Sequence, residues 1–129
     1  MDNKFYDQVR EFRQKLDLPV NDKPQLLDPH STSFYARFVM EELSEWLKAH
    51  EKQDLVDSAD ALGDLIYVIC GIAHHQGFDL PQILQFIHEA NMKKVPGTTR
   101  RGHSQDAVKP ESWQGPEGNI SLHLFGCMR

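Results

Sequence analysis

Apolar residues recur at helical intervals along the first two thirds of this chain. Phe5, Val9, Phe12 and Leu16 repeat at spacings of 4, 3 and 4. This spacing places all four on one face of an amphipathic helix over about residues 2–16. The rest of that helix is mostly polar, so we expect it to pack against the protein along a single stripe.

Three further helices are predicted after a proline-containing loop at residues 17–30. They cover about residues 33–50, 54–75 and 79–94. Residues suited to helix N-caps precede or open each segment, namely Ser31, Thr32 and Ser33, then Asp54, then Asp79 with Gln82. Four helices joined by short loops predict an all-α fold, a four-helix-type bundle.

The last part of the chain has a different character. It is rich in Gly, Pro and Ser, and residues 119–125 alternate only weakly between apolar and polar, so no strand pattern is convincing. We therefore expect two parts. Residues 1–95 form the helical core, and residues 96–129 form an irregular C-terminal tail that packs on the core or on a partner subunit.

The predicted third helix is apolar on more than one side. Its main stripe follows alternating spacings of 4 and 3 and comprises Leu55, Ala59, Leu62, Ile66, Ile69 and Ala73. A line of aspartates falls on the opposite side, and further apolar residues lie between the two. We expect such a helix to be buried by its own bundle and by a second one. The sequence therefore predicts a homodimer, or a larger oligomer, that forms through the helices.

Charge is divided unevenly along the chain. Residues 1–92 carry 8 Lys and Arg against 16 Asp and Glu, and residues 93–129 carry 6 against 3. An acidic body argues against a general nucleic-acid binder, which presents a basic face. It fits a protein that holds a metal ion in its body and uses its basic tail on phosphates, although a merely solvated terminus is the alternative for the tail.

Nothing in the sequence indicates a membrane protein or a secreted one. No apolar run approaches the ~20 residues of a membrane span, and the N-terminal residues lack the apolar segment of a signal peptide. Cys70 and Cys127 do not have the spacing of metal ligands, and Cys70 lies among apolar residues, as a reduced core cysteine does. We expect a cytoplasmic protein.

Acidic side chains cluster on the predicted second and third helices. On one helix Glu41 and Glu42 lie four and three residues before Glu45, and on the other Asp57, Asp60 and Asp64 follow one another at spacings of three and four. Like charges at this spacing repel one another. If the two helices pack antiparallel, five or six carboxylates face one cavity, where a cation is needed to offset their burial.

Mg²⁺, with Mn²⁺ as a substitute, is the cation that suits such a set of oxygen ligands. It would neutralise phosphate charge and lower the pKa of a bound water, while a carboxylate free of the metal accepts the proton. A di-iron bundle needs Glu-x-x-His pairs on two helices, and the sequence contains none. The alternative is that the glutamates form a solvated face paired with Arg37 and Lys48. That alternative is weaker for the aspartates, because Asp is a poor helix former.

Several segments resemble one enzyme family. Glu41-Glu42-Leu43-Ser44-Glu45 matches an EExxE motif, and residues 60–94 resemble a second motif with its following helix, which ends in Ala90-Asn91-Met92-Lys93-Lys94. Lys109-Pro110-Glu111-Ser112-Trp113 resembles a C-terminal K-P-x-x-W stretch. Over about residues 5–115 these motifs resemble, in order and spacing, those of the MazG-like all-α nucleoside triphosphate pyrophosphohydrolases.

The resemblance implies a Mg²⁺-dependent enzyme that hydrolyses a nucleoside triphosphate (NTP or dNTP) to the monophosphate and pyrophosphate, and so clears unwanted nucleotides. It implies catalytic roles for Glu41, Glu42 and Glu45. The metal ligands expected are these three glutamates together with Asp60 and Asp64.

One position departs from the family pattern. The second motif is usually ExxD, and counting back from Asp64 places Ala61 where the Glu belongs. Asp60 lies about 100° round the helix from that position, whereas Asp57-x-x-Asp60 keeps the spacing with a shorter acid. We favour Asp60 and Asp64 as ligands, and the number of metal ions stays open.

Three substrate contacts come from the resemblance. Arg37, one turn before Glu41, is implied to orient that carboxylate or a phosphate, and Asn91 and Lys94 are implied to contact phosphate or sugar. Asn91 is in line with apolar residues of its helix and is expected to point inward, where an amide needs partners. Lys94 also has a structural explanation, because a lysine in the last turn favours the helix dipole.

Three more residues have two interpretations each. Phe12 stacks on a base or belongs to the core stripe of its helix. Tyr67 lies on the acidic face of the third helix, where its hydroxyl can reach substrate or a ligand carboxylate. Lys109 closes over phosphates from the tail or belongs to a mobile basic loop.

Two other hypotheses stay open beside the enzyme. One is a catalytically reduced regulatory protein that binds metal or nucleotide on the same bundle, which Ala61 favours. The other is a purely structural dimerisation module. The expected partners are a nucleotide and further copies of this chain, in a dimer or a tetramer, with no membrane and no nucleic-acid polymer.

Overall fold

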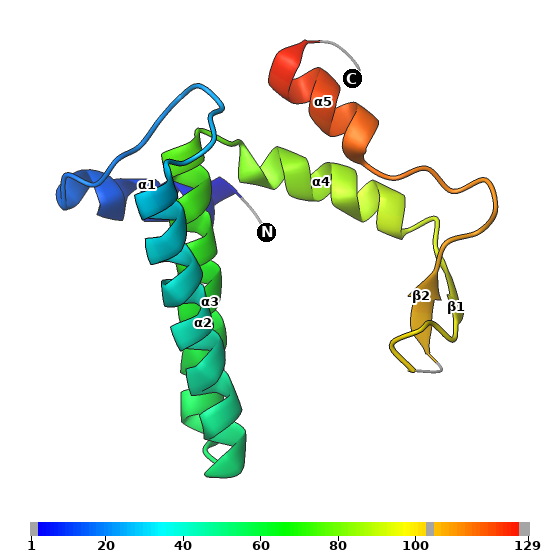
Figure 1. The fold of residues 1–129 in the computed structure, drawn as a ribbon, viewed down its shortest axis with the longest axis horizontal. Coiled ribbons are helices and arrows are strands. Elements are labelled where there is room, and N and C mark those ends of the chain that lie inside the picture. The colour runs from blue at the N-terminus through cyan, green and yellow to red at the C-terminus, as the bar shows by residue number, and fades with distance from the viewer. Residues whose placement is uncertain (1–2, 103–104, 127–129) are drawn as a thin grey trace. The chain divides into compact units, whose positions relative to one another are not determined.

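The computed structural model describes residues 3–102 and 105–126, which form five helices and one two-stranded hairpin (Figure 1). The chain divides into two compact units, Met1–Leu80 and Pro81–Arg129. The first unit holds α1, α2 and α3, and the second holds nearly all of α4 together with β1, β2 and α5. The predicted all-α class is confirmed. Dimerisation stays a prediction.

A long helical pair dominates the first unit. Helices α2 (Pro29–Glu51) and α3 (Leu55–Gln76) lie side by side, drawn in cyan and green in Figure 1. Only three residues connect them, so they run antiparallel, as the sequence predicts. Helix α1 (Asn3–Lys15) packs on α3.

Capping explains where these helices begin and end. Helix α2 starts earlier than predicted, because the carboxylate of Asp28 accepts a hydrogen bond from the backbone N–H of Ser31 at 2.8 Å and Pro29 occupies the first turn. The expectation that Ser31, Thr32 or Ser33 caps it was therefore wrong. Asp54 caps α3 as predicted, and Gly77 ends α3 with a φ of 76° that favours glycine.

The core of the first unit is small and lies between α1 and α3. It consists of Tyr6, Val9, Cys70 and Ala73. The Tyr6 ring stacks on the buried ring of His74 at 3.7 Å, and the Tyr6 hydroxyl donates to the carbonyl of Phe78. Cys70 is buried and free, which confirms its predicted role in the core, whereas Cys127 lies outside the described residues.

The second unit is more regular than the sequence indicates. Helix α4 (Leu80–Asn91) ends three residues earlier than predicted, and strands β1 (Val95–Gly97) and β2 (Asp106–Val108) pair antiparallel. Residues 119–125 belong to helix α5 (Glu117–Phe125). The prediction of an irregular tail without strands was therefore wrong.

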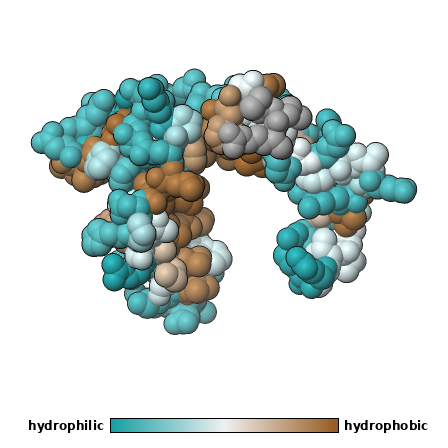
Figure 2. All heavy atoms as spheres, turned by 45° about the horizontal axis from the view of Figure 1, so that its top comes forward, coloured by the Kyte–Doolittle hydropathy of each residue, from teal (hydrophilic) through white to brown (hydrophobic). Residues whose placement is uncertain are grey.

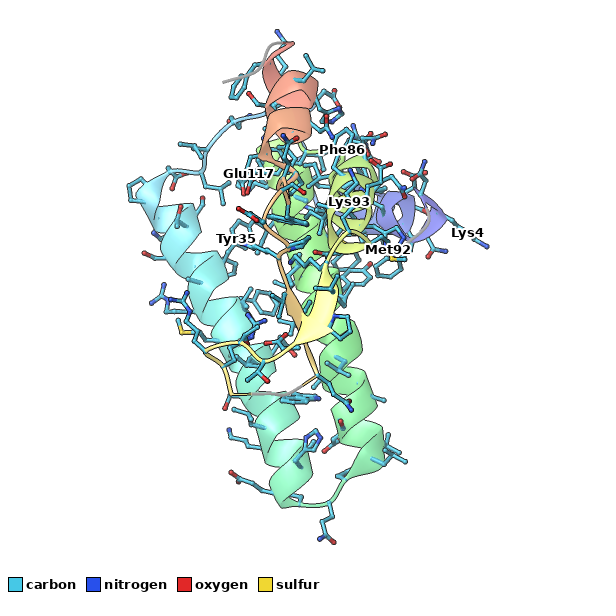
Figure 3. The ribbon with its side chains drawn as sticks, turned by 90° about the vertical axis from the view of Figure 1, so that its right-hand side faces the viewer. Lys4, Tyr35, Phe86, Met92, Lys93 and Glu117 are labelled. Atoms are coloured by element: carbon cyan, nitrogen blue, oxygen red, sulfur yellow. The ribbon has the colours of Figure 1, made fainter. Side chains whose placement is uncertain are left out.

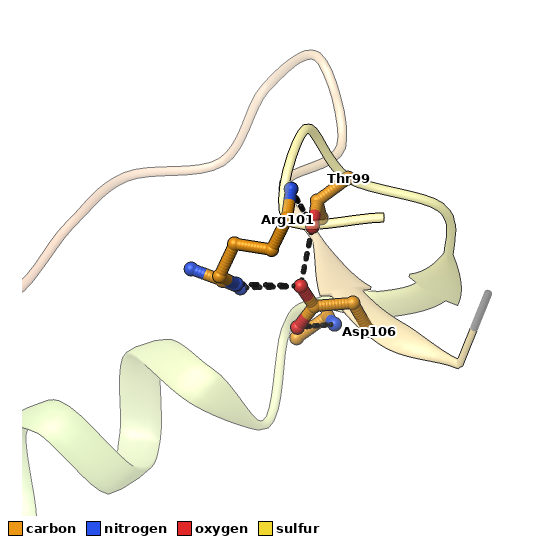
Figure 4. Close-up of polar contacts among 4 residues, drawn as sticks. Thr99, Arg101 and Asp106 are labelled. Atoms are coloured by element: carbon orange, nitrogen blue, oxygen red, sulfur yellow. Dashed lines mark hydrogen bonds and ion pairs between the residues drawn. The ribbon is translucent and has the colours of Figure 1, made fainter. Parts of the chain in front are cut away.

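Polar contacts near the turn stabilise this hairpin. Thr99 and Arg101 both donate to the carboxylate of Asp106, with Arg101 Nε at 2.7 Å (Figure 4). The Arg101 and Thr99 hydrogen bonds hold the pKa of Asp106 well below its usual range. Short strands of this kind gain much of their order from such local contacts.

Large apolar side chains remain exposed on α2 and α3, as Figure 2 shows in brown. The predicted stripe of α3 is only partly covered, since Leu62 is 49% exposed and Ile66 47%. Met40, Leu43 and Leu47 of α2 are also exposed. Contiguous apolar surface of this sort marks an interaction site. Within the described residues, no helix has the length and apolar character that crossing a membrane requires.

Candidate active site

Carboxylates from two helices line one cavity, which we call the acid cavity. Its volume is about 120 Å³, and its walls are Glu42 and Glu45 of α2 and Asp57, Asp60, Ala61 and Asp64 of α3. The antiparallel pair places these faces opposite each other, and spacings of three and four keep each set on one side of its helix. Five of the six carboxylates singled out in the sequence therefore meet here.

The charges of the acid cavity are poorly compensated. Glu42 is half-buried, and burial raises its pKa, with further contributions from Asp64, Glu41, Glu45 and Asp60. The ion pair nearest to these groups joins Lys48 Nζ to Glu45 at 3.9 Å, with both side chains about half exposed. An exposed pair of this kind contributes little. The set therefore favours a bound cation.

A hard cation fits the donor set, since every candidate ligand is a carboxylate oxygen. The oxygens are not yet at coordinating positions, because no group of three or more His, Cys, Asp or Glu in the described part of the chain could hold a metal ion as placed. Binding thus requires side-chain rotation, which exposed carboxylates such as Glu45 and Asp64 can make. Ala61 forms part of the wall, so the position that departs from the motif does face the cavity.

A second, more open hollow adjoins the acid cavity along α2. Phe34, Arg37, Phe38, Glu41 and Glu42 line it, and we call it the Arg37 hollow. Glu42 borders both spaces. Glu41, by contrast, lines the hollow and not the acid cavity, beside the predicted substrate residue Arg37.

A third space, the aromatic pocket, has a volume of about 200 Å³. Phe12, Phe34, Phe38 and Tyr67 are among its walls, and the rings of Phe12 and Tyr67 meet edge to face at 5.5 Å. Phe34 and Phe38 also border the Arg37 hollow. The three spaces therefore follow one another along α2, linked by residues that they share.

The order of these spaces was detectable in the sequence. Phe34, Phe38 and Glu42 are four residues apart, so they form one line on α2. Of these three residues only Glu42 belongs to a recognisable motif, whereas Phe34 and Phe38 at helical spacing are equally typical of a core stripe. Their shared role is evident only in the structure, where residues of α1 and α3 complete the spaces that this line borders.

A known protein family matches the part of the chain that contains the three spaces. A model of phosphoribosyl-ATP pyrophosphohydrolases matches residues 9–91, from the middle of α1 to the end of α4. The chain belongs to the phosphoribosyl-ATP pyrophosphohydrolase family. This family is part of the MazG-like all-α superfamily that the motifs resemble. No curated protein matches the chain at a significant level.

Family membership makes the protein a pyrophosphohydrolase, an enzyme that acts on acid anhydrides, and it implies Mg²⁺ dependence. The matched residues include every wall of the acid cavity and of the Arg37 hollow. The aromatic pocket is covered as well. Strands β1 and β2 and helix α5 lie beyond the match.

The second unit of this pyrophosphohydrolase gathers two predicted substrate residues. Lys94 Nζ lies 5.1 Å and Lys109 Nζ 4.9 Å from the ring centroid of Trp113, whose Nε1 donates to the carbonyl of Ala90 at 2.7 Å. Both lysines are thus held on one aromatic ring. Asn91 is exposed at the end of α4, so the expectation that it points inward was wrong.

Proposed function

We propose that this pyrophosphohydrolase uses Mg²⁺, or Mn²⁺ in its place, to hydrolyse a nucleoside triphosphate (NTP or dNTP) to the monophosphate and pyrophosphate, clearing unwanted nucleotides. The observation that carries this proposal is the acid cavity, in which two helices contribute five carboxylates to one space. Such a set costs free energy unless a cation and its phosphate ligand occupy it. The substrate named for the family, phosphoribosyl-ATP, is a compound of the same type.

Three carboxylates of the acid cavity would hold the metal, namely Glu45, Asp60 and Asp64, which leaves Glu42 free of it. Bound Mg²⁺ neutralises phosphate charge and favours deprotonation of water. Glu42 is suited to accept the proton of the attacking water, because its raised pKa makes it the better base. The water oxygen then bonds to the α-phosphorus, the bond from the α-phosphorus to the bridging oxygen breaks, and that oxygen leaves with pyrophosphate.

The substrate follows the line of spaces on α2. Its base enters the aromatic pocket, where Phe12 and Tyr67 contact it, and its phosphates cross the Arg37 hollow towards the acid cavity. Arg37 contacts a phosphate there and orients Glu41, which lines the same hollow. An arginine suits phosphate because its planar fork donates two parallel hydrogen bonds.

The second unit provides further cations. Asn91 and Lys94 contact phosphate or sugar of the substrate, and Lys109, which shares the ring of Trp113 with Lys94, contacts a phosphate. These residues act on the site of their own chain or of a partner. We accordingly assign residues 1–95 as the pyrophosphohydrolase core and residues 96–129 as a tail that packs on a core.

A second copy of the chain covers the exposed apolar surface of α2 and α3. The exposure of Leu62 and Ile66 supports this homodimer, because one chain leaves the stripe uncovered. Sedimentation should show a dimer or tetramer, and Ile66→Lys should shift it to monomer. A monomeric wild type would contradict the assembly without affecting the assignment of the reaction.

A substrate panel tests the reaction. Pyrophosphate release is measured from the common NTPs and dNTPs and from phosphoribosyl-ATP, with Mg²⁺, with Mn²⁺ and without metal. Release from at least one compound, dependent on metal and abolished by Glu45→Gln and by Asp64→Asn, is expected. Nucleotide binding without release from any of them would instead favour the regulatory protein, the alternative that Ala61 supports.

A further inference from the structure

Asp57 lines the acid cavity, yet the proposed reaction gives it no part. It belongs to the first turn of α3, near the end where the connection to α2 joins the two helices side by side (Figure 3). At about 100° per residue, Asp57 and Asp64 lie only about 20° apart around the helix, and Ala61 lies about 40° from Asp57. Asp57 therefore shares one line of α3 with a proposed metal ligand.

Ala61 leaves the middle of this line without an oxygen atom that could bind a cation. Only 3% of its surface is exposed, and it forms part of the cavity wall at the position where the motif has a glutamate. Helical side chains lean towards the N-terminus of their helix, so a glutamate at 61 would carry its carboxylate back over the turn that separates it from Asp57. Alanine leaves that space to the aspartate.

The carboxylate of Asp57 is available for such a role. In the helix cap, Asp57 uses its backbone N–H, which donates to the carboxylate of Asp54 at 3.0 Å. In the described part of the chain, no ion pair involves the Asp57 side chain. Because Asp57 is exposed, its side chain can rotate readily. It can therefore turn towards a cation without breaking an ion pair of its own.

We propose that Asp57 is a further ligand of the divalent cation and fills the place that Ala61 leaves empty. A cation such as Mg²⁺ can take another carboxylate oxygen, because a site built from a few carboxylates leaves several of its coordination positions to water. The inference rests on the proposed function, because it assumes that Glu45, Asp60 and Asp64 hold a cation in the acid cavity. The departure at Ala61 then changes which residue is a ligand and does not remove the ion.

A purely structural role of Asp57 makes a different prediction. A negative charge in the first turn stabilises a helix through its dipole. Asp57→Asn would then lower the melting temperature of the metal-free protein and leave its affinity for a cation unchanged. The ligand role predicts a weaker affinity whatever happens to the melting temperature. The affinity of the folded protein for the cation is therefore the quantity to measure.

Calorimetric titration with Mn²⁺ gives this affinity for wild type, Asp57→Asn and Asp54→Asn. Asp54→Asn is the matched control, because it removes one negative charge at the start of the same helix, does not line the acid cavity, and keeps a good capping residue. Asp57→Asn should bind Mn²⁺ about 10- to 100-fold more weakly, the range by which even groups behind a ligand change metal affinity. Asp54→Asn should stay within about 2-fold of the wild type, because salt screens charges outside the site.

A further variant tests the exchange between positions 57 and 61. Asp57→Asn combined with Ala61→Glu moves the carboxylate to the position of the motif glutamate, so it should regain most of the affinity that Asp57→Asn loses. A folded double variant that binds Mn²⁺ no better than Asp57→Asn would contradict the exchange. If the double variant does not fold, the comparison of Asp57→Asn with Asp54→Asn decides.

The titration also separates this inference from the proposed function. Equal affinities of Asp57→Asn and Asp54→Asn, with Mn²⁺ bound by the wild type, would overturn the inference and leave the proposed function standing. An affinity that depends on Asp57, in a protein that releases pyrophosphate from no compound of the substrate panel, would support the ligand role while the proposed reaction fails. A wild type that does not bind Mn²⁺ would refute both.

Discussion

The acid cavity and the aromatic pocket lie along the same pair of helices, yet they hold charge in opposite ways. The buried cation of the aromatic pocket, Arg13, is fixed by hydrogen bonds to neutral groups of Pro19 and Tyr35. The acid cavity gathers half-exposed and exposed carboxylates whose repulsion raises the pKa of Glu42 further than burial does alone. The first space is organised by the chain itself. The second depends on a ligand cation.

The largest effect is expected from Glu42→Gln. Loss of the proton acceptor should lower kcat by about 10²- to 10⁴-fold, while removal of one like charge leaves the melting temperature unchanged or higher. Pyrophosphate release and thermal melts measure the two quantities. Glu51→Gln, an exposed change at the end of the same helix, is the control and should leave both unchanged. A melting temperature that falls with activity would mean that Glu42 acts in the fold rather than in the reaction.

Next in size is a pair of valine truncations that compares the buried side of the aromatic pocket with the exposed surface of α3. Val9 is 1% exposed and belongs to both the core and the aromatic pocket, so Val9→Ala should lower the free energy of unfolding by about 2 kcal/mol. Val56, on α3, is 77% exposed in one chain. Val56→Ala should change that free energy by less than about 0.5 kcal/mol in a monomeric preparation. Urea unfolding measures both, and similar losses would contradict the core described here.

A smaller effect is expected from pH. The folded protein binds a proton at Glu42 more tightly than the unfolded chain, because its pKa is raised above 4.5 by burial and by Asp64 and its neighbours. Without metal, this group therefore makes the free energy of unfolding fall as pH rises from 4.5 through the raised pKa. Urea unfolding of the wild type and of Glu42→Gln isolates this trend. The free energy of unfolding of the wild type minus that of Glu42→Gln should fall as pH rises, and an increase would refute the prediction.

Much of this arrangement was predictable from helical periodicity. The spacing of Asp60 and Asp64 and the short connection to α2 together predicted that the carboxylates converge. Helix ends were less accessible, because Asp28 before Pro29 competes with three hydroxyl residues as a cap, and only the observed hydrogen bond to Ser31 decides. The hairpin was missed because strands of three residues carry no periodicity. Arg13 was missed because nothing local distinguishes a buried arginine from the partly exposed Arg10.

The central claim is that carboxylates of α2 and α3 together bind a divalent cation, and one thermal melt tests it most directly. Wild type and Asp64→Asn are melted with and without Mg²⁺. Mg²⁺ at about 100 times its Kd should stabilise the wild type by about 2.7 kcal/mol and raise its melting temperature, whereas Asp64→Asn should lose most of that rise. An unchanged wild type, or an equal rise in both proteins, would contradict the account.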